Sequence, residues 1–288
     1  MNAPTLPRAI SSQEVRRRRT PWWTILVLSL VGLVFLIPAY WMLTAAFKPN
    51  SDIYQWPLNF WPETFTWDNF SSAFAAAPFG RFFTNSIVIT TIGATVKVSM
   101  AICTAYAFAF LQFPGKKWMF LGILGALMVP GHVTLLINYI TIGNLGLINS
   151  YAGIILPGLG SAFGTFLLRQ HFLSLPAEVM EAAELDGAGH LRRLFSFVLP
   201  MSIPAVVTVA LIAVIDDWNE FIWPMLVTNT VEMRTMPIGL MYLKQTEGMN
   251  DWGVIMAGTV LVVVPMLLLF LFAQRFIVAG LAGTVVKR

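Results

Sequence analysis

Long apolar stretches separated by short polar segments make up the hydrophobic pattern of this 288-residue chain. A bilayer core about 30 Å thick needs about 20 apolar residues in helical conformation, with a range of roughly 17–25. Stretches of about that length predict six membrane-spanning helices, at Trp22–Phe47, Asn85–Leu111, Trp118–Ile142, Tyr151–Leu168, Met201–Val227 and Val254–Phe276. The fourth is barely long enough, and polar residues interrupt the far end of the fifth, namely Asp216, Asp217, Asn219 and Glu220. The pattern predicts an all-α integral membrane protein.

The composition agrees with a chain that folds in lipid. Hydrophobic residues make up 57% of the sequence, charged residues only 11%, and the mean hydropathy is +0.73. Soluble domains carry about 25% charged residues, so this chain has less than half of the charged residues that usually cover a protein folded in water. The net charge of +4 does not indicate nucleic acid, because the basic residues are placed for membrane orientation.

Basic residues gather on one side of the predicted membrane. If the N-terminus is placed in the cytoplasm, that side holds thirteen of the 18 Lys and Arg residues, the other side holds four, and Lys97 lies within the second span. Short cytoplasmic loops are enriched in Lys and Arg. The sequence therefore predicts that both termini are cytoplasmic, with a tail at 1–21, a six-helix transmembrane domain at 22–276 and a second tail at 277–288.

The longest predicted cytoplasmic connection, residues 171–200, carries the most specific pattern in the chain. Pro176 followed by two glutamates is typical of a helix start, because Pro fits the first turn and carboxylates favour the N-terminal end of the helix dipole. Gly187 permits a sharp turn, and residues 190–197 can form a second short helix. The segment predicts a helix–turn–helix against the cytoplasmic face. An ordinary interfacial helix is the alternative, but it predicts Lys and Arg on its polar face and no acidic first turn.

Within this loop a set of residues follows a fixed spacing: Glu181-Ala182-Ala183, three residues, Gly187, nine residues, Phe197, one residue, Leu199-Pro200. The pattern resembles the EAA loop of the permease subunits of binding-protein-dependent ABC importers, in which Ile is usual where Phe197 stands. Further segments are similar to the carbohydrate-uptake branch of that family, namely 149–152, 166–170, 218–224 and 276–281. The chain most resembles the shorter permease of maltose-type and glycerol-3-phosphate-type importers, which implies the type I ABC importer permease fold.

The resemblance implies how the loop acts. In the family the loop is a coupling helix that fits a cleft on the ATPase subunit, so Glu181 would pair with a basic residue there. Ala182 and Ala183 would allow close helix approach, and Gly187 would make the turn. Three more residues of the loop belong to the same expected coupling surface, namely Asp186, Leu199 and Pro200.

Energy for transport is expected to come from another chain. Gly115-Lys116-Lys117 lacks both the upstream Gly and the following Ser or Thr of a phosphate-binding loop. We therefore expect no catalytic residue, cofactor or metal on this chain, and ATP and Mg on a partner ATPase. The resemblance implies a second, homologous permease subunit, two ATPase subunits and an extracytoplasmic solute-binding protein as partners, with surrounding lipid and no nucleic acid. It implies a multi-pass protein of the bacterial inner (plasma) membrane.

Polar residues inside the predicted spans are candidates for the translocation pathway. A charge such as that of Lys97 costs at least about 2.5–3.5 kcal/mol at mid-span on insertion scales. Its helical neighbours are small, so Lys97 faces other helices and not lipid. Lys97 either lines the pathway or pairs with a carboxylate, Asp216 or Asp217. The polar cluster at 216–220, including Asn219 and Glu220, either lines the outer half of the pathway or contacts a partner at the water boundary.

The sequence therefore predicts a permease subunit of an ATP-driven importer for a sugar-like solute, which works by alternating access. The same machinery could import glycerol-3-phosphate or a polyol. A secondary transporter driven by an ion gradient is a more distant alternative, since it needs intramembrane carboxylates and often shows paired repeats. Asp216 and Asp217 favour that alternative, whereas the chain shows no internal repeat and carries the coupling-loop pattern.

Overall fold

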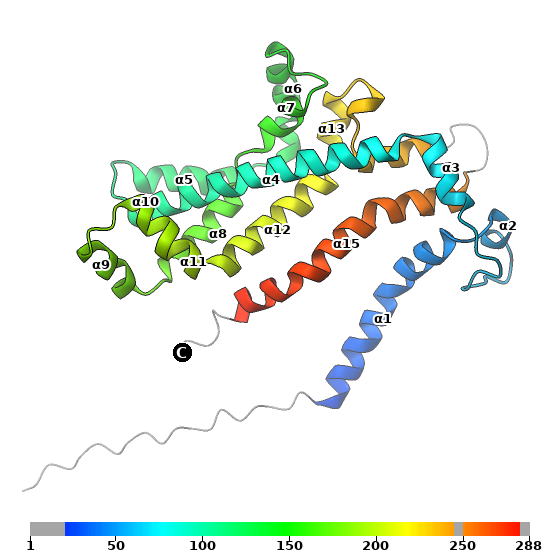
Figure 1. Ribbon diagram of the computed structural model, residues 1–288, viewed down its shortest axis with the longest axis horizontal. Helices are drawn as coiled ribbons and strands as arrows, with labels where there is room; N and C mark the ends of the chain where they lie inside the picture. The colour runs from blue at the N-terminus through cyan, green and yellow to red at the C-terminus, as the bar shows by residue number, and fades with distance from the viewer. Residues whose placement is uncertain (1–20, 245–249, 283–288) are drawn as a thin grey trace, which may run out of the picture. The chain divides into compact units, whose positions relative to one another are not determined.

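The computed structural model describes residues 21–244 and 250–282. The predicted N-terminal tail lies outside the described residues except for Pro21, and so do the last six residues of the predicted C-terminal tail. All regular secondary structure in the described part of the chain is helical (Figure 1). Of the described residues, those up to Trp41 belong to one compact unit and those from Met42 onward to another.

Helix α1, Trp22–Ala45, is an uninterrupted apolar helix of 24 residues. Its large side chains are exposed from Trp22 to Ile37, and Leu28 is 66% accessible. A helix that is apolar around its whole circumference suits a lipid environment, and at about 1.5 Å per residue this one is long enough to cross a bilayer. The first predicted span therefore corresponds to one helix that is long and apolar enough to cross a membrane.

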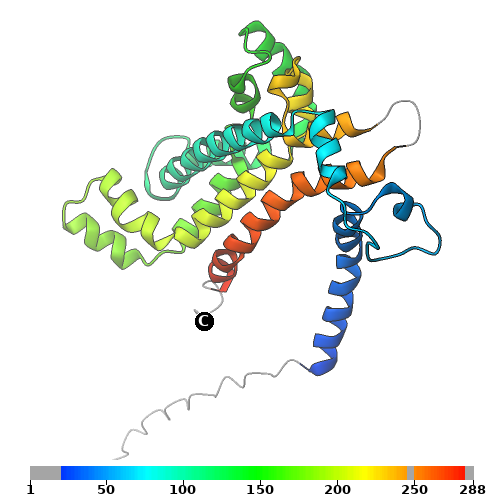
Figure 2. The same ribbon diagram turned by 45° about the vertical axis from the view of Figure 1, so that its right-hand side comes forward.

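Three long helices run side by side through the second unit: α4 (Phe79–Phe110), α12 (Ile203–Asn219) and α15 (Trp252–Ala282). Figures 1 and 2 show them together, with α8 (Ala162–Leu173) against α4. Small buried side chains such as Ala101 and Ala105 lie where α4 meets α8 and α12. Small residues let helices approach closely in membranes, where burial of apolar area gives little driving force. The second and sixth predicted spans correspond to α4 and α15.

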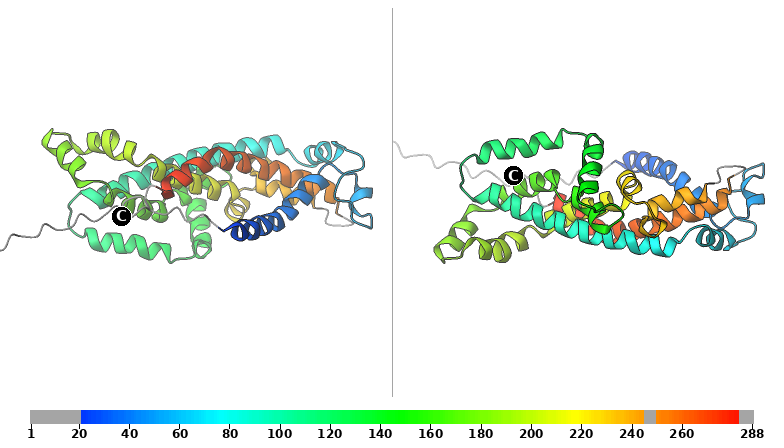
Figure 3. Two further views of the ribbon diagram at one scale, coloured as in Figure 1. Left: turned by 90° about the horizontal axis from the view of Figure 1, so that it is seen from below. Right: turned by 90° about the horizontal axis from the view of Figure 1, so that it is seen from above.

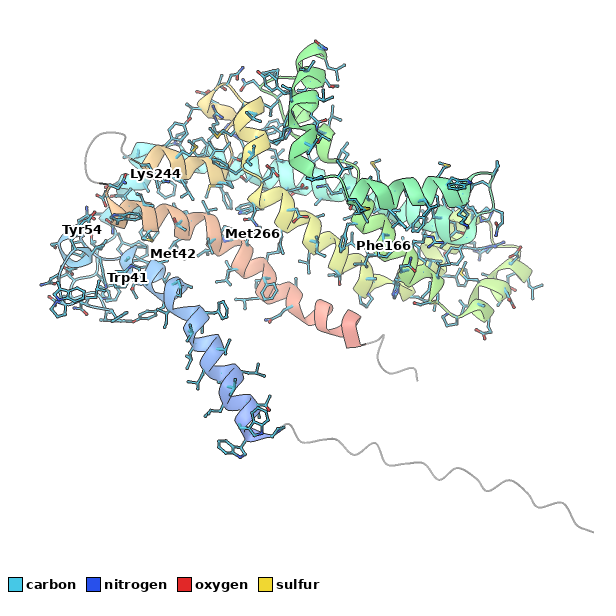
Figure 4. All side chains as sticks on the ribbon, turned by 180° about the vertical axis from the view of Figure 1, so that it is seen from behind. Trp41, Met42, Tyr54, Phe166, Lys244 and Met266 are labelled. Carbon is cyan, nitrogen blue, oxygen red and sulfur yellow. The ribbon has the colours of Figure 1, made fainter. Side chains whose placement is uncertain are left out.

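Basic side chains close the C-terminal end of α4. The Lys116 ammonium donates a hydrogen bond to the Leu111 carbonyl at 2.8 Å, and Arg169 Nε donates to the Phe108 carbonyl at 3.0 Å. Cations are favourable here because the last carbonyls of a helix lack intrahelical partners and carry the negative end of the dipole. Arg169 also lies over the Phe120 ring, 4.1 Å from its centroid. Phe120 in turn stacks on Phe166 of α8, labelled in Figure 4.

The opposite end of the unit is built from short helices and loops. Tyr54, labelled in Figure 4, follows α2 (Asn50–Ile53) and donates from its hydroxyl to the Asn250 carbonyl at 2.7 Å. Asn69 of α3 (Asp68–Ala76) donates to the Ala46 and Lys48 carbonyls. The remaining helices of this end are η4 (Val231–Met233), α14 (Met236–Gly239) and η5 (Leu240–Leu243). Asn85 of α4 donates to the carbonyls of Glu232 and Arg234, so these loops are fixed to the bundle.

The prediction of one continuous helix at 118–142, the third predicted span, was wrong. Helix α5 (Lys116–Leu127) ends before Pro130 and is followed by η1 (Gly131–Thr134) and α6 (Leu135–Asn144). Proline lacks an N–H, and it disfavours helical conformation in the residue before it. Twelve residues of α5 extend only about 18 Å. Figures 1 and 3 show α5 and α6 running in different directions.

The fourth and fifth predicted spans are bent. Helices α7 (Tyr151–Ile155) and η2 (Leu156–Gly158) meet α8 at 48°, and the segment His190–Met201 meets α12 at 84°. Helix α12 ends at Asn219, and α13 (Ile222–Val227) follows as a separate helix. By length and composition, three described helices can cross a membrane, and the two bent pairs raise the number to five.

Candidate functional site

The predicted helix–turn–helix is present. Helix α9 (Ala177–Leu185) and helix α10 (His190–Arg193) are joined by a tight turn, and α10 continues through the π-helix η3 (Leu194–Val198) into α11 (Leu199–Met201). Gly187 has a φ of 71° in this turn. The Ala188 N–H donates to the Ala183 carbonyl at 2.9 Å, a bond that closes a helix C-terminus in the Schellman motif. The glycine predicted to make the turn therefore makes it.

The helix pair is held to the bundle by buried side chains and one polar contact. Ala183, Leu194 and Val198 are at most 3% exposed, and Leu194 and Val198 pack in the cluster with α4, α8 and α12. The Tyr106 hydroxyl of α4 lies 3.3 Å from His190 Nδ1, at the first residue of α10. Since Tyr106 is 5% exposed, this contact links the helix pair directly to a buried side chain near the C-terminal end of α4.

Arg193 fixes the two short helices to each other. Its Nε donates to the Ala188 carbonyl at 2.7 Å, and its Nη1 lies 3.1 Å from Glu184 Oε2. The Glu184 side chain is 68% exposed, and exposed ion pairs contribute about 0–1 kcal/mol. The backbone contact therefore matters more than the ion pair for keeping the turn rigid.

The outer surface of the helix pair combines acidic and apolar groups. The expected coupling residues Glu181, Ala182 and Asp186 are exposed, whereas Ala183 is buried beneath them. Three further apolar side chains point outward, with exposures of 89%, 73% and 63%: Leu185, Leu191 and Phe195. These three residues were not among the predicted coupling residues, although apolar residues in a polar loop are a visible signal. Pro200 is also exposed, and Leu199 is half-buried.

Lys97 and Asp217 form an ion pair between α4 and α12. Lys97 Nζ lies 2.6 Å from Asp217 Oδ1, and the two side chains are 14% and 18% exposed. A Cβ atom on Gly93 would lie 2.9 Å from Asp217 Oδ2, so a glycine at this position makes room for the carboxylate. Oδ2 has no hydrogen-bond partner among the described residues. Of the two partners considered for Lys97, the structure places Asp217 in contact.

The ion pair lines a cavity of about 310 Å³, which we call the charged cavity. Its polar lining comprises Lys97, Thr134, Asn138, Asp216, Asp217 and Glu220. Glu220 Oε1 accepts a hydrogen bond from the Trp223 N–H at 3.1 Å, at the start of α13. Asn219 is exposed and is not among the lining residues. Four of the five candidate pathway residues therefore meet in one place, and the fifth does not.

Helix breaks create the charged cavity. Gly131 and Thr134 come from the break between α5 and α6, Pro157 and Gly158 from the bend before α8, and Glu220 from the break after α12. Inside a membrane, irregular backbone is tolerated where it is buried in protein or lines a water-filled cavity. Discontinuous helices around a polar cavity are typical of membrane transport proteins. The arrangement defines the class as a membrane transport component.

The comparisons with known proteins identify the family. Residues 98–283 match the family described as binding-protein-dependent transport system inner membrane component, and the chain belongs to it. The chain is 34% identical over 266 residues to the sn-glycerol-3-phosphate transport system permease protein UgpE of Yersinia pestis bv. Antiqua (strain Antiqua), covering 90% of this chain and 95% of that protein. It is 31% identical over 279 residues to the arabinooligosaccharides transport system permease protein AraQ of Halalkalibacterium halodurans, covering 95% and 100%.

Solved structures share the fold. A chain of a bacterial ABC transporter involved in the import of the acidic polysaccharide alginate superposes with a TM-score of 0.78 at 21% identity, over 88% of this chain and 95% of that one. A chain of a bacterial alginate ABC transporter, in complex with an alginate pentasaccharide-bound periplasmic protein, gives a TM-score of 0.64 at 15% identity, over 88% and 93%. The expected resemblance to an ABC importer permease is confirmed at the level of family and fold.

Proposed function

We propose that this chain forms half of the translocation pathway of an ATP-driven importer for a sugar or sugar-like solute, in a bacterial inner membrane. The observation that carries the proposal is the rigid helix pair with Glu181, Leu185 and Leu191 exposed on its surface. A large apolar surface on a polar loop marks a protein interface. The family membership and the polar cavity in the bundle support the same conclusion.

The proposed topology has six crossings and two cytoplasmic termini. Five crossings follow the long helices and the bent pairs, and the sixth consists of α5 and α6 together as a broken span. The support is the distribution of basic residues, thirteen of 18 on the side of the helix pair. The cytoplasmic side is where an ATP-consuming partner would dock.

The proposed mechanism couples two ATPase subunits to the bundle through the helix pair. Glu181 would pair with a basic residue of the ATPase, while Leu185, Leu191 and Phe195 would fill an apolar groove. Movement of the docked pair would pass to α4 through Tyr106 and to α12 through the segment that enters it at 84°. A rigid connection of this kind transmits rigid-body motion. ATP and Mg belong to the partner in this scheme, and a binding protein delivers solute to a heterodimer with a second permease.

The charged cavity is the proposed solute contact on this chain. Its carboxylates accept hydrogen bonds from hydroxyl groups, which a sugar presents in number. The exposed carboxylates of Asp216 and Glu220 in the lining support this role. Glycerol-3-phosphate is a second candidate solute, favoured by the 34% identity to UgpE. A polyol would use the same hydroxyl contacts.

The test is a Glu181→Lys substitution, with Glu63→Lys as a control of equal charge change on an exposed residue outside the helix pair. The transporter is assembled with its ATPase in membrane vesicles. We expect Glu181→Lys to lower ATPase binding and vanadate-sensitive uptake at least tenfold, and Glu63→Lys to leave ATPase binding unchanged. Equal ATPase binding by both variants would overturn the docking role. Uptake that resists vanadate but is lost on collapse of the ion gradient would favour a secondary transporter.

A further inference from the structure

A second cavity lies next to the charged cavity and shares part of its lining. It has a volume of about 260 Å³ and includes Ser161, Phe163 and Val209 in its lining. Lys97 and Asp216 line both cavities, and they are the two residues common to the two linings. The two cavities therefore adjoin at these two side chains and together form the proposed solute route.

The charges along this route do not balance. Three carboxylates, Asp216, Asp217 and Glu220, face a single ammonium group, that of Lys97. No other charged side chain of the described residues lines either cavity. Because Lys97 is bound to Asp217 at 2.6 Å, the pair is neutralised internally. Asp216 and Glu220 remain as a surplus of two carboxylates.

Among the described residues, the lining of the two cavities contains no free cationic group that could bind an anion. Phosphate and carboxylate groups are recognised by Arg, Lys or convergent backbone N–H groups. The one ammonium group of the route is occupied by Asp217, and Gly93 keeps that carboxylate close by leaving room for it. An anionic solute would have to approach Asp216 and Glu220, which are exposed and form no ion pair among the described residues, and their like charge would repel it.

We propose that Asp216 and Glu220 make the pathway of this chain selective by charge, so that it admits neutral and cationic solutes and rejects phosphorylated and carboxylated ones. The inference rests on the proposed function and narrows its substrate class to unsubstituted sugars, polyols and amino sugars, so that glycerol-3-phosphate is ruled out among the candidate solutes. Clefts lined by one sign of charge concentrate ions of the opposite sign by about 10–10³-fold. Hydroxyl groups, which donate hydrogen bonds to carboxylates, pass without this penalty.

The test measures the charge preference of the cavity without knowledge of the solute. Cys103 is the only cysteine of the chain, so Cys103→Ser makes this chain cysteine-free, and modification is measured on this chain after its separation from the partner subunits. A single cysteine is introduced by Thr134→Cys in the charged cavity or, as a reference, by Asn144→Cys at the exposed end of α6. The assembled transporter in vesicles is treated with cationic trimethylammonioethyl, anionic sulfonatoethyl and neutral methyl methanethiosulfonate, with and without ATP and vanadate.

We expect the ratio of cationic to anionic modification rates to be at least about tenfold higher at position 134 than at position 144. Adding Glu220→Gln or Asp216→Asn should reduce that ratio several-fold while the rate for the neutral reagent stays the same. Equal ratios at the two positions would overturn the proposal. Failure of the neutral reagent to modify position 134 in either nucleotide state would also overturn it, because the cavity would then lie off any aqueous route.

The two proposals fail in different ways. Vanadate-sensitive ATPase activity of the same vesicles reports on the importer function, and the modification ratio reports on the charge of the cavity. Coupled ATPase activity with equal ratios would refute charge selection alone. A high ratio in vesicles that show no coupled ATPase activity or uptake would refute the importer function and leave the acidic cavity in place.

Discussion

Removal of Lys97 tests the central contact of the bundle. In the Lys97→Met variant a side chain of similar length replaces the ammonium, and the Asp217 carboxylate is left without its partner at a site where its side chain is only 18% exposed. Oδ2 already lacks a partner among the described residues, and Gly93 lies directly beside it. In the described part of the chain, Lys97 is therefore the only hydrogen-bond donor to this carboxylate.

The expected cost follows from this burial. Breaking a buried ion pair by removing one partner costs about 3–5 kcal/mol. The lower end of this range applies, about 3 kcal/mol, because both side chains keep some exposure. That is more than a hundredfold in the equilibrium constant for folding, and roughly a 6–12 °C loss in melting temperature. In the double variant Lys97→Met with Asp217→Asn no charge of the pair remains, so most of this loss should be recovered.

The assay is the melting temperature of the detergent-purified chain, together with its level in the membrane. Lys117→Met serves as the control, because Lys117 is an exposed lysine at the start of α5, and surface substitutions usually change stability by less than about 0.5 kcal/mol. The single variants and the double variant form a cycle that isolates the coupling energy. Equal melting temperatures of the Lys97→Met and Lys117→Met variants would contradict a stabilising ion pair. So would a double variant whose loss of stability equals the sum of the losses from Lys97→Met and Asp217→Asn.

Two further predictions concern glycines. Gly93→Ala should destabilise the chain by about 1–3 kcal/mol, because the added Cβ would lie 2.9 Å from Asp217 Oδ2. Gly122→Ala is the control in the same melting assay. Its added Cβ would have nothing within 4 Å, so it should be neutral or slightly stabilising. Gly187→Ala should lower the folding stability by about 1–2 kcal/mol, because φ at this position is 71°. It should also weaken ATPase binding measured by co-purification, whereas the control Gly189→Ala should leave binding unchanged. Equal melting temperatures within either pair would contradict the corresponding contact or turn.

Proline shows why the breaks in the helices could not be placed from the sequence. Pro38 lies within α1 and Pro265 within α15, and both helices continue past them. Pro130, by contrast, lies where α5 has ended and η1 begins. Proline removes one hydrogen bond in each case, and in membranes the surrounding helices decide whether the freed groups find other partners. Pro130 was visible in the sequence as a helix breaker, but whether the helix ended there depended on how the surrounding helices pack.

The ion-pair partner of Lys97 could likewise not be chosen from the sequence. Asp216 and Asp217 are adjacent, so their side chains point about 100° apart on a helix, and only Asp217 pairs with Lys97. Sequence alone left both open. The Tyr106–His190 contact was also missed, because it joins residues 84 positions apart and neither residue type signals the other.

Residues close together in the sequence determined much of the secondary structure. Apolar length predicted the long helices, and the glycine, proline and acidic residues of the loop predicted the helix–turn–helix, because helix termini and turns depend on residues within a few positions of each other. Tertiary packing decided which carboxylate pairs with Lys97, which side chains of the helix pair remain exposed, and where the breaks converge on one cavity. Those outcomes depend on the register between helices that are far apart in the chain, and no local pattern encodes that register.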